Sequence, residues 1–311
     1  MAQFGLAVRN FVGPGEIPDV AGLYAYAQRA ERLGFESLWV WDHILLGVQP
    51  AFPILDAVAT LAALAARTER IKLGTGVLVL PLRNPVVSAK VLSSLDVISS
   101  GRLILGVAAG WYAREFDAAG VPFKQRGRRF ERNLDILLKL WTEEQVTMRV
   151  DDVNLRQAVM VPRPVQRPRP PVLIGGYVDA VLRRAATVGD GWLTYFYTPE
   201  SFARNWAKVR AFAREIGRDP AMLTSTNQLA IYVGRSREQT AADMRRWLST
   251  EWDTAAWSES TIEHAVHGSV DECVEQLQAH LVTGVDRLIL IPYRYQAEQV
   301  ERIAEEVLPQ L

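Results

Sequence analysis

Residues 68–116 read TERIKLGTGVLVLPLRNPVVSAKVLSSLDVISSGRLILGVAAGWYAREF and contain three predicted elements in a row. Two short runs of aliphatic and β-branched residues, Ile71–Leu80 and Leu103–Ala108, are predicted to be buried strands. The apolar periodicity of Pro85–Ile98, between them, predicts a helix. Two strands that are apolar on both faces and are joined by a helix form a βαβ unit of a parallel sheet.

Both predicted strands run into turns rich in glycine. Gly-Thr-Gly occupies positions 74–76 inside the first strand, and Ala-Ala-Gly-Trp occupies 108–111 at the end of the second. Glycine at such places lets a flat ligand or another backbone approach closely. The sequence therefore predicts an active site beside these turns.

The alternation of strand and helix continues along the whole chain. Further strands are predicted at Gln3–Arg9, Glu36–Trp41, Val172–Gly175, Gly191–Tyr195, Thr224–Val233 and Arg287–Ile291. Further helices are predicted at Val20–Leu33, Ile54–Ala66, Arg126–Trp141, Asp179–Val188, Pro199–Ile216, Arg237–Trp252, Val270–Val282 and Gln296–Leu308.

Eight strands that alternate with about eight helices predict a (β/α)8 TIM barrel, with residues 1–311 forming a single domain. A polar and proline-rich excursion, residues 142–171, precedes strand 5, and an irregular insertion near Asp253–Gly268 follows strand 7. A doubly wound sheet is the alternative. It usually carries G-x-G-x-x-G after the first strand, whereas this strand ends in VRNFVGPG.

Composition excludes several classes of protein. Lys+Arg and Asp+Glu both number 35, so the chain has no net positive charge that would favour binding to nucleic acid or to an anionic membrane. The first residues, MAQFGLAVRN, read as a strand, and no apolar run is long enough to span a membrane. The single cysteine, Cys273, excludes an internal disulfide and a cysteine metal cluster, and we expect a buried, inert thiol. The sequence predicts a cytoplasmic protein.

In a barrel the chemistry lies at the carboxyl ends of the strands. His43 follows strand 2, where an imidazole can bind a ligand or move a proton near neutral pH; the alternative is a histidine that only caps the loop. Its neighbour Asp42 is expected to orient the loop.

The ends of strands 3 and 5 are both rich in glycine. Gly74–Val77 is either a simple bulge or a backbone that supports one face of a planar ring. Gly175, Gly176 and Tyr177 lead into a helix near Asp179, and free N–H groups at a helix start bind phosphate. We expect Asp179 to be the N-cap of this helix.

Aromatic residues follow strands 4 and 6. Trp111 and Tyr112 come after Gly110, where they form either a pocket wall or ordinary loop packing. Arg114 and Glu115 are expected to pair with each other.

Tyr195 and Tyr197 offer apolar walls with polar tips at the end of strand 6. The chain lacks metalloprotease, Walker and nucleophile-elbow motifs, and its four histidines are scattered, so no metal site is expected. Without a strong acid–base set, this barrel mouth suggests that a cofactor carries the chemistry.

The chain resembles the luciferase-like flavin monooxygenase superfamily, closely over residues 1–195 and loosely beyond. More narrowly, it resembles the branch that uses the deazaflavin coenzyme F420. The resemblance rests on the motifs Trp41-Asp-His43-Ile-Leu-Leu, Thr68-Glu-Arg-Ile-Lys-Leu-Gly-Thr-Gly-Val77, Leu82-Arg-Asn-Pro, Ala89-Lys, Leu95-Asp, Ser100-Gly-Arg, Gly110-Trp, Arg126-Gly-Arg-Arg, Pro164-Val-Gln, Gly175-Gly and Gly189-Asp-Gly-Trp192.

The resemblance implies a (β/α)8 barrel, usually a homodimer, with a non-prolyl cis peptide at Gly76–Val77 against the central ring of the cofactor. It implies a phosphate site at Gly175–Tyr177 and places His43 near the reactive end of the ring. A related sugar-phosphate dehydrogenase has a catalytic glutamate where this chain has Trp111, so that reaction is not expected.

Three hypotheses follow. The first is an oxidoreductase that moves a hydride between F420 and a small or medium organic substrate, with His43 as the catalytic residue. The second is an FMN monooxygenase that receives reduced flavin from a partner reductase and activates oxygen. The third is a non-catalytic flavin-binding barrel.

The cofactor pocket would be shaped by Thr75, Gly76, Val77, Gly110 and Trp111, with phosphate at Gly175, Gly176 and Tyr177. The substrate would be bounded by Trp41, Tyr112, Tyr195 and Tyr197.

The two cofactors differ in their tails. F420 has the longer and more anionic tail, so a basic track beside the phosphate cradle would favour it. Arg183, Arg184 and the segment Arg163–Arg169 are the candidate members of that track.

Overall fold

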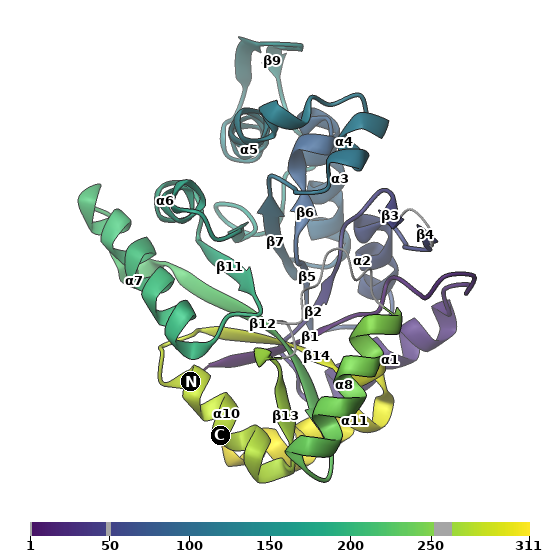
Figure 1. Cartoon of the computed structure of the whole chain (residues 1–311). Coiled ribbons are helices and arrows are strands. Elements are labelled where there is room, and N and C mark those ends of the chain that lie inside the picture. Colours follow the sequence, from purple (N-terminus) through teal and green to yellow (C-terminus); the bar gives the residue numbers. More distant parts are fainter. Residues whose placement is uncertain (1, 48–50, 252–262) are drawn as a thin grey trace.

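Parallel strands close into a barrel around one axis (Figure 1). A computed structural model describes residues 2–47, 51–251 and 263–311 of the chain. Within these residues the barrel strands are, in spatial order, β1 (Gln3–Ala7), β2 (Ser37–Val40), β5 (Lys72–Thr75), β7 (Leu103–Ala108), β10 (Val172–Gly175), β11 (Gly191–Tyr195), β12 (Thr224–Val233) and β14 (Arg287–Pro292). Pairing of β7 with β10 and of β14 with β1 closes the ring, which confirms the predicted TIM barrel.

Helices cover the outside of the barrel. They are α1 (Val20–Arg32), α2 (Ala57–Ala65), α3 (Pro85–Ile98), α5 (Arg126–Thr142), α6 (Asp179–Thr187), α7 (Pro199–Glu215), α8 (Arg237–Glu251), α10 (Val270–Leu281) and α11 (Ala297–Arg302). Local signals fix their starts: Asn84 caps α3 with Pro85 at its first position, and Ser269 with Glu272 forms a capping box on α10. Among the described residues, no helix is both long and apolar enough to cross a membrane.

The predicted third strand, Ile71–Leu80, is divided. β5 ends at Thr75, and a short strand, β6 (Leu78–Val79), follows and pairs with β7 alone. The peptide bond between Gly76 and Val77, which separates the two, is cis, as the resemblance implied.

The excursion before strand 5 contains regular structure that the sequence did not reveal. Strands β8 (Val146–Val150) and β9 (Val153–Ala158) form an antiparallel hairpin beside the start of α5 (Figure 1). Arg132 on α5 pairs with Asp151 and Asp152 at the hairpin turn, which fixes the hairpin to the helix. The sequence predicted the excursion but not the hairpin within it, because the hairpin is polar on one face and reads as loop.

The predicted insertion after strand 7 lies partly outside the described residues, which omit 252–262. Its described end contains β13 (Val266–Gly268), a short strand that extends the sheet beside the last residues of β12. Two further short strands, β3 (Leu46–Gly47) and β4 (Ala51–Phe52), follow β2.

An indole ring lies at the centre of the lower barrel interior, in a cluster with the buried Ile104, Leu173 and Ile289. Trp39 is fully buried, and a Cβ on Gly74 of the next strand would lie 2.4 Å from its ring. Beneath the ring, Arg287 donates two hydrogen bonds of 2.9 Å to the carboxylate of Glu36. Burial acts to raise the pKa of Glu36, but the hydrogen bonds and charge of Arg287 outweigh it and lower that pKa to about 2.

Candidate active site

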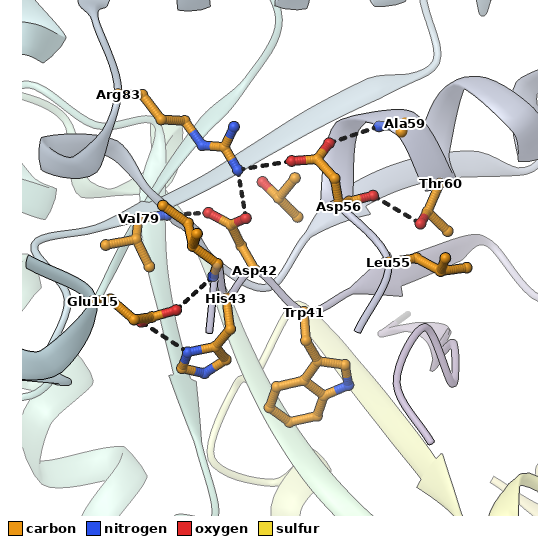
Figure 2. A network of polar contacts seen from close by, with 12 residues as sticks. Trp41, Asp42, His43, Leu55, Asp56, Ala59, Thr60, Val79, Arg83 and Glu115 are labelled. Carbon is orange, nitrogen blue, oxygen red and sulfur yellow. Dashed lines mark hydrogen bonds and ion pairs between the residues drawn. The ribbon is translucent and has the colours of Figure 1, made fainter. Parts of the chain in front are cut away.

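The histidine after β2 is held by a buried carboxylate. His43 Nδ1 lies 3.0 Å from Glu115 Oε2, and Figure 2 shows the carboxylate between the imidazole and the chain that follows it. The second oxygen of Glu115 accepts hydrogen bonds from the backbone N–H groups of Ile44 and Leu45. Glu115 is 1% exposed. Since a carboxylate only accepts, the hydrogen-bond network assigns the proton of the neutral ring to Nδ1 and leaves Nε2 as the acceptor.

The expected pairing of Glu115 with Arg114 is wrong. Arg114 Nη1 donates instead to the carbonyl of Gly47 at 2.6 Å. Glu115 lies on α4 (Ala113–Ala118), the short helix that follows β7. His43 and Glu115 are 72 positions apart, so no local spacing could reveal their contact. The only sign of this role in the sequence is that Glu115 is an acidic residue next to Phe116, which is buried.

Asp42 orients the same loop, as expected. Its carboxylate accepts from the backbone N–H of Val79 at 2.8 Å and from Arg83 at 2.6 Å (Figure 2). Arg83 also reaches Asp56 at 3.1 Å. Burial raises the pKa of Asp42 and the charge of Arg83 offsets this only in part. The loop after β2 is thereby tied to β6.

Trp41 is positioned by a side-chain amide from the segment after β1. The side chain of Asn10 donates to the carbonyls of Trp41 and Leu55, both at 2.9 Å, and accepts from the N–H of Trp41 at 3.1 Å. The Trp41 ring meets Phe11 edge to face. This places the predicted substrate wall at the barrel mouth.

Backbone, rather than side chains, forms the floor of the mouth. A Cβ on Gly76 would have its nearest neighbours at 3.6 and 3.7 Å, in the Trp39 ring and the Gln228 amide. A methyl group on Gly76 would therefore be in ordinary van der Waals contact with both side chains. Val77 lies against Gly175, where a Cβ would come within 2.8 Å, so the ends of strands 3 and 5 meet.

Thr75 and Gly110 have structural roles beside this floor. The Thr75 hydroxyl is fully buried and donates to the carbonyl of Gly106 at 2.7 Å. Gly110 has φ +79°, and a Cβ there would lie 2.6 Å from Val79. This close approach and positive φ explain the glycine.

Two aromatic rings stand beside His43. Trp111 and Tyr112 pack against each other with centroids 5.2 Å apart, and each meets the imidazole edge to face at 6.1 and 6.3 Å. Trp111 remains 52% exposed. The structure thus brings three of the predicted site residues together.

The predicted phosphate cradle lies across the floor. Gly176 has φ +131° and its carbonyl accepts from the Trp192 indole at 2.6 Å. The expected N-cap is corrected: Val178 caps α6 and offers no side-chain hydrogen bond to its first amides. Asp179 is the first helical residue and turns to Lys208 at 2.8 Å. The start of α6 thus has no side-chain cap of its own.

Tyrosines gather beside the cradle. Burial raises the pKa of Tyr195, and the neighbouring Tyr177 and Tyr197 raise it further, so the three rings are close in space. Tyr197 also packs on Trp192 with centroids 5.8 Å apart. Tyr177 and Tyr195 remain exposed at the mouth.

The structure gives the candidate basic track other partners. Arg183 pairs with Glu215 and Arg184 with Glu131. Along the segment 163–169, Arg163 and Arg167 bond backbone carbonyls, while Arg169 pairs with Asp190. These contacts hold the arginines to the outer helices and connecting segments.

His267, His280 and the cysteine are buried in the protein. The hydroxyl oxygen of Thr240 lies 3.0 Å from Nδ1 of His267. Burial lowers the pKa of His280 to about 4. Cys273 is buried, as expected, which raises the pKa of its thiol to about 12. Within the described part of the chain, no group of three or more His, Cys, Asp or Glu side chains is placed to hold a metal ion.

A family model described as luciferase-like monooxygenase matches residues 3–287. The protein belongs to this luciferase-like monooxygenase family. An F420-dependent glucose-6-phosphate dehydrogenase of Amycolatopsis mediterranei is 28% identical over 93% of this chain and 94% of its own length. An FMNH2-dependent dimethylsulfone monooxygenase of Pseudomonas putida is 27% identical over 91% of this chain and 85% of its own.

Solved structures of the family share the fold. An F420-dependent secondary alcohol dehydrogenase superimposes with a TM-score of 0.83 over 99% of this chain and 98% of its own, at 19% identity. The relatives are dehydrogenases, reductases and monooxygenases, and this protein is an oxidoreductase of their family. Relatives named for F420 and for FMN match it almost equally well, which supports a flavin or deazaflavin cofactor.

Proposed function

We propose that this protein moves a hydride between coenzyme F420 and a small or medium organic substrate. The observation that carries the proposal is the backbone floor at Gly76 beside an imidazole fixed by Glu115. The residues fit a planar cofactor, because Gly76, directly after β5, carries no side chain and the half-exposed Trp111 beside His43 offers an aromatic surface. The uncapped start of α6 fits the cofactor's phosphate.

When bound, F420 would supply the ring carbon that gives or accepts the hydride. His43 would orient the substrate and hold or release a proton at Nε2, because Nδ1 is engaged by Glu115. Trp111 and Tyr112 would exclude water beside the imidazole. Trp41, Tyr195 and Tyr197 would bound the substrate.

The second candidate is an FMN monooxygenase that takes reduced flavin from a partner reductase. The dimethylsulfone monooxygenase at 27% identity over nearly the whole chain favours it. Formation of product only in the presence of oxygen and reduced FMN would support this alternative. A complex that turns over no substrate would support the non-catalytic barrel.

The test is a fluorescence titration of the purified protein with F420 and, separately, with FMN. Both cofactors are used oxidised and, without oxygen, reduced. Tight binding of F420 alone supports the first proposal, and binding of FMN alone supports the second. Binding of neither overturns both.

The matched variant is Gly76→Ala. The new methyl group meets no atom closer than 3.6 Å, so the variant should fold as the wild type does. It would add a methyl group beside the Trp39 ring and the Gln228 amide, on the surface where we propose that the ring rests, and we expect cofactor affinity to fall at least tenfold. Unchanged affinity would remove the floor from the cofactor site.

We also propose a homodimer. Exposed aliphatic residues form a stripe on α3 and the segment beside it, which is joined to α3 by Lys90 and the carbonyl of Val161. The stripe consists of Val87, Val91, Ile98, Val159, Val161 and Val165. A second copy of the chain would cover it. Sedimentation velocity should show a dimer that Val91→Glu dissociates, and a monomeric wild type would refute this. The cytoplasmic location and the single domain stay predictions of the sequence.

A further inference from the structure

One side-chain amide in the barrel interior makes no hydrogen bond to any described residue. Gln228 lies on β12 and is 1% exposed. Its carboxamide makes no hydrogen bond within residues 2–47, 51–251 and 263–311, and lies 3.7 Å from the point where a Cβ on Gly76 would stand. Buried amides are nearly always hydrogen-bonded in folded proteins, because an unpaired one costs free energy. A partner for Gln228 must therefore come from outside the described chain.

The surroundings of this amide are largely apolar. The Trp39 ring lies on the same side of Gly76, 3.6 Å from the Cβ position. On the neighbouring strands Gln228 is level with Tyr195 and Ile289. Asn227, the next residue, faces the other way and donates to the Tyr197 carbonyl at 3.1 Å. Gln228 is therefore the amide of β12 that faces the floor.

A carboxamide presents one acceptor and two donors in a plane. The matching chemistry is a flat heterocycle whose edge alternates C=O and N–H groups. The pyrimidine-dione edge shared by flavins and deazaflavins has this pattern. We propose that Gln228 recognises that edge and so orients the ring that rests against Gly76. This inference depends on the proposed function.

The test uses the variant Gln228→Met, which keeps the length of the side chain and removes the amide. Affinity for F420 or FMN, whichever the wild type binds, should fall about tenfold, since a hydrogen bond to the ring is lost. Thermal stability of the free protein should stay equal or rise, because the free protein loses an unpaired amide. Gln228→Asn, with a shorter side chain, should weaken binding as well and serves if the first variant does not fold.

The matched control is Gln299→Met. Gln299 is also buried, but its amide is saturated by the backbone N–H and carbonyl of Val233 at 2.9 and 3.0 Å. This variant should lose stability and keep its cofactor affinity. The two glutamines thus separate a ligand contact from a structural one.

A chemical probe locates the contact on the ring. FMN methylated at N3 lacks the N–H of the dione edge, so the wild type should bind it about tenfold more weakly than FMN. Gln228→Met should show no such difference. If the wild type binds a cofactor and Gln228→Met binds both probes as the wild type does, the inference is overturned while the proposed function stands. If the wild type binds neither cofactor, the proposed function itself fails.

Discussion

The lower interior of the barrel and its mouth are built from the same strands in opposite ways. Below, Trp39 fills the space over Gly74 and Arg287 saturates the carboxylate of Glu36. Above, a Cβ on Gly76 would meet its nearest neighbours at 3.6 Å and beyond, which are ordinary contact distances. The two buried carboxylates show the contrast: the pKa of Glu36 falls to about 2, whereas that of Asp42 rises although it too has an arginine partner. The lower half serves stability, and the mouth leaves polar groups poised for a ligand.

The largest expected effect comes from a substitution in the lower half of the barrel interior. Arg287→Met leaves the carboxylate of Glu36 largely buried with Lys72 alone, so the free energy of unfolding should fall by about 3 kcal/mol. Urea denaturation measures this. Lys72→Met, which removes the half-exposed partner, should cost less than about 1 kcal/mol. Equal losses in the two variants would show that Arg287 stabilises the Glu36 carboxylate no more than Lys72 does.

The ion pair between Arg287 and Glu36 predicts that the stability of the protein depends on pH. The folded-state pKa of Glu36 is depressed, so its contribution to stability is complete above about pH 4.5 and is lost as the pH falls toward about 2. Denaturation curves of the wild type should show this loss between pH 4.5 and 2. Arg287→Met should flatten that limb, and an unchanged acid limb would contradict the assignment.

Gly74 on β5 and Gly76 just after it sharpen the comparison. An alanine at Gly74 would place its methyl 2.4 Å from the buried Trp39 ring, and unfolding should become easier by about 1–3 kcal/mol. At Gly76 the same change meets nothing closer than 3.6 Å, and stability should stay within about 0.5 kcal/mol. Thermal melts of both variants give the answer. A larger loss at Gly76 than at Gly74 would reverse our description of the two halves.

A third change acts on the fixed imidazole. Glu115→Gln exchanges a buried acceptor of three hydrogen bonds for an amide with one acceptor oxygen, and should cost about 1–2 kcal/mol of stability. The ¹⁵N chemical shifts of His43 should report loss of the single tautomer, and turnover should fall at least tenfold. Arg114→Gln is the control and should leave the His43 signals unchanged. If both variants move the signals equally, Glu115 does not set the tautomer.

The smallest effect concerns the cradle. Val178→Ser supplies the hydroxyl that the start of α6 lacks, which should raise the free energy of unfolding by about 0.5–1 kcal/mol. Differential scanning calorimetry can resolve this. No gain in stability would mean that the first amides of α6 are already satisfied in the free protein.

The elements that carry strong local patterns were predictable from sequence. The bounds of α3 and β7 agree with the prediction at every residue, because Asn84 and Pro85 mark the start of α3 and β7 is a continuous apolar run. The division of β5 from β6 and the hairpin β8–β9 were missed, because both depend on pairing with distant chain.

The candidate site was only partly predictable for the same reason. Glycines and aromatic residues after strands identified the barrel mouth. The partners of His43, Arg183 and Arg184 come from other helices, and a single sequence carries no sign of such contacts. Gln228 was missed because a polar residue in a buried strand gives no periodic signal of its own.

The amide of Asn10 makes the place of Trp41 independent of the loop that follows it. Both backbone groups of Trp41 are bonded to a side chain from the segment after β1, and the same side chain holds Leu55 at the start of α2. The chain between His43 and Leu55 can therefore change in length or sequence while the indole stays in place. Such a junction lets a family vary one rim of its pocket, and with it the choice of substrate, without rebuilding the barrel.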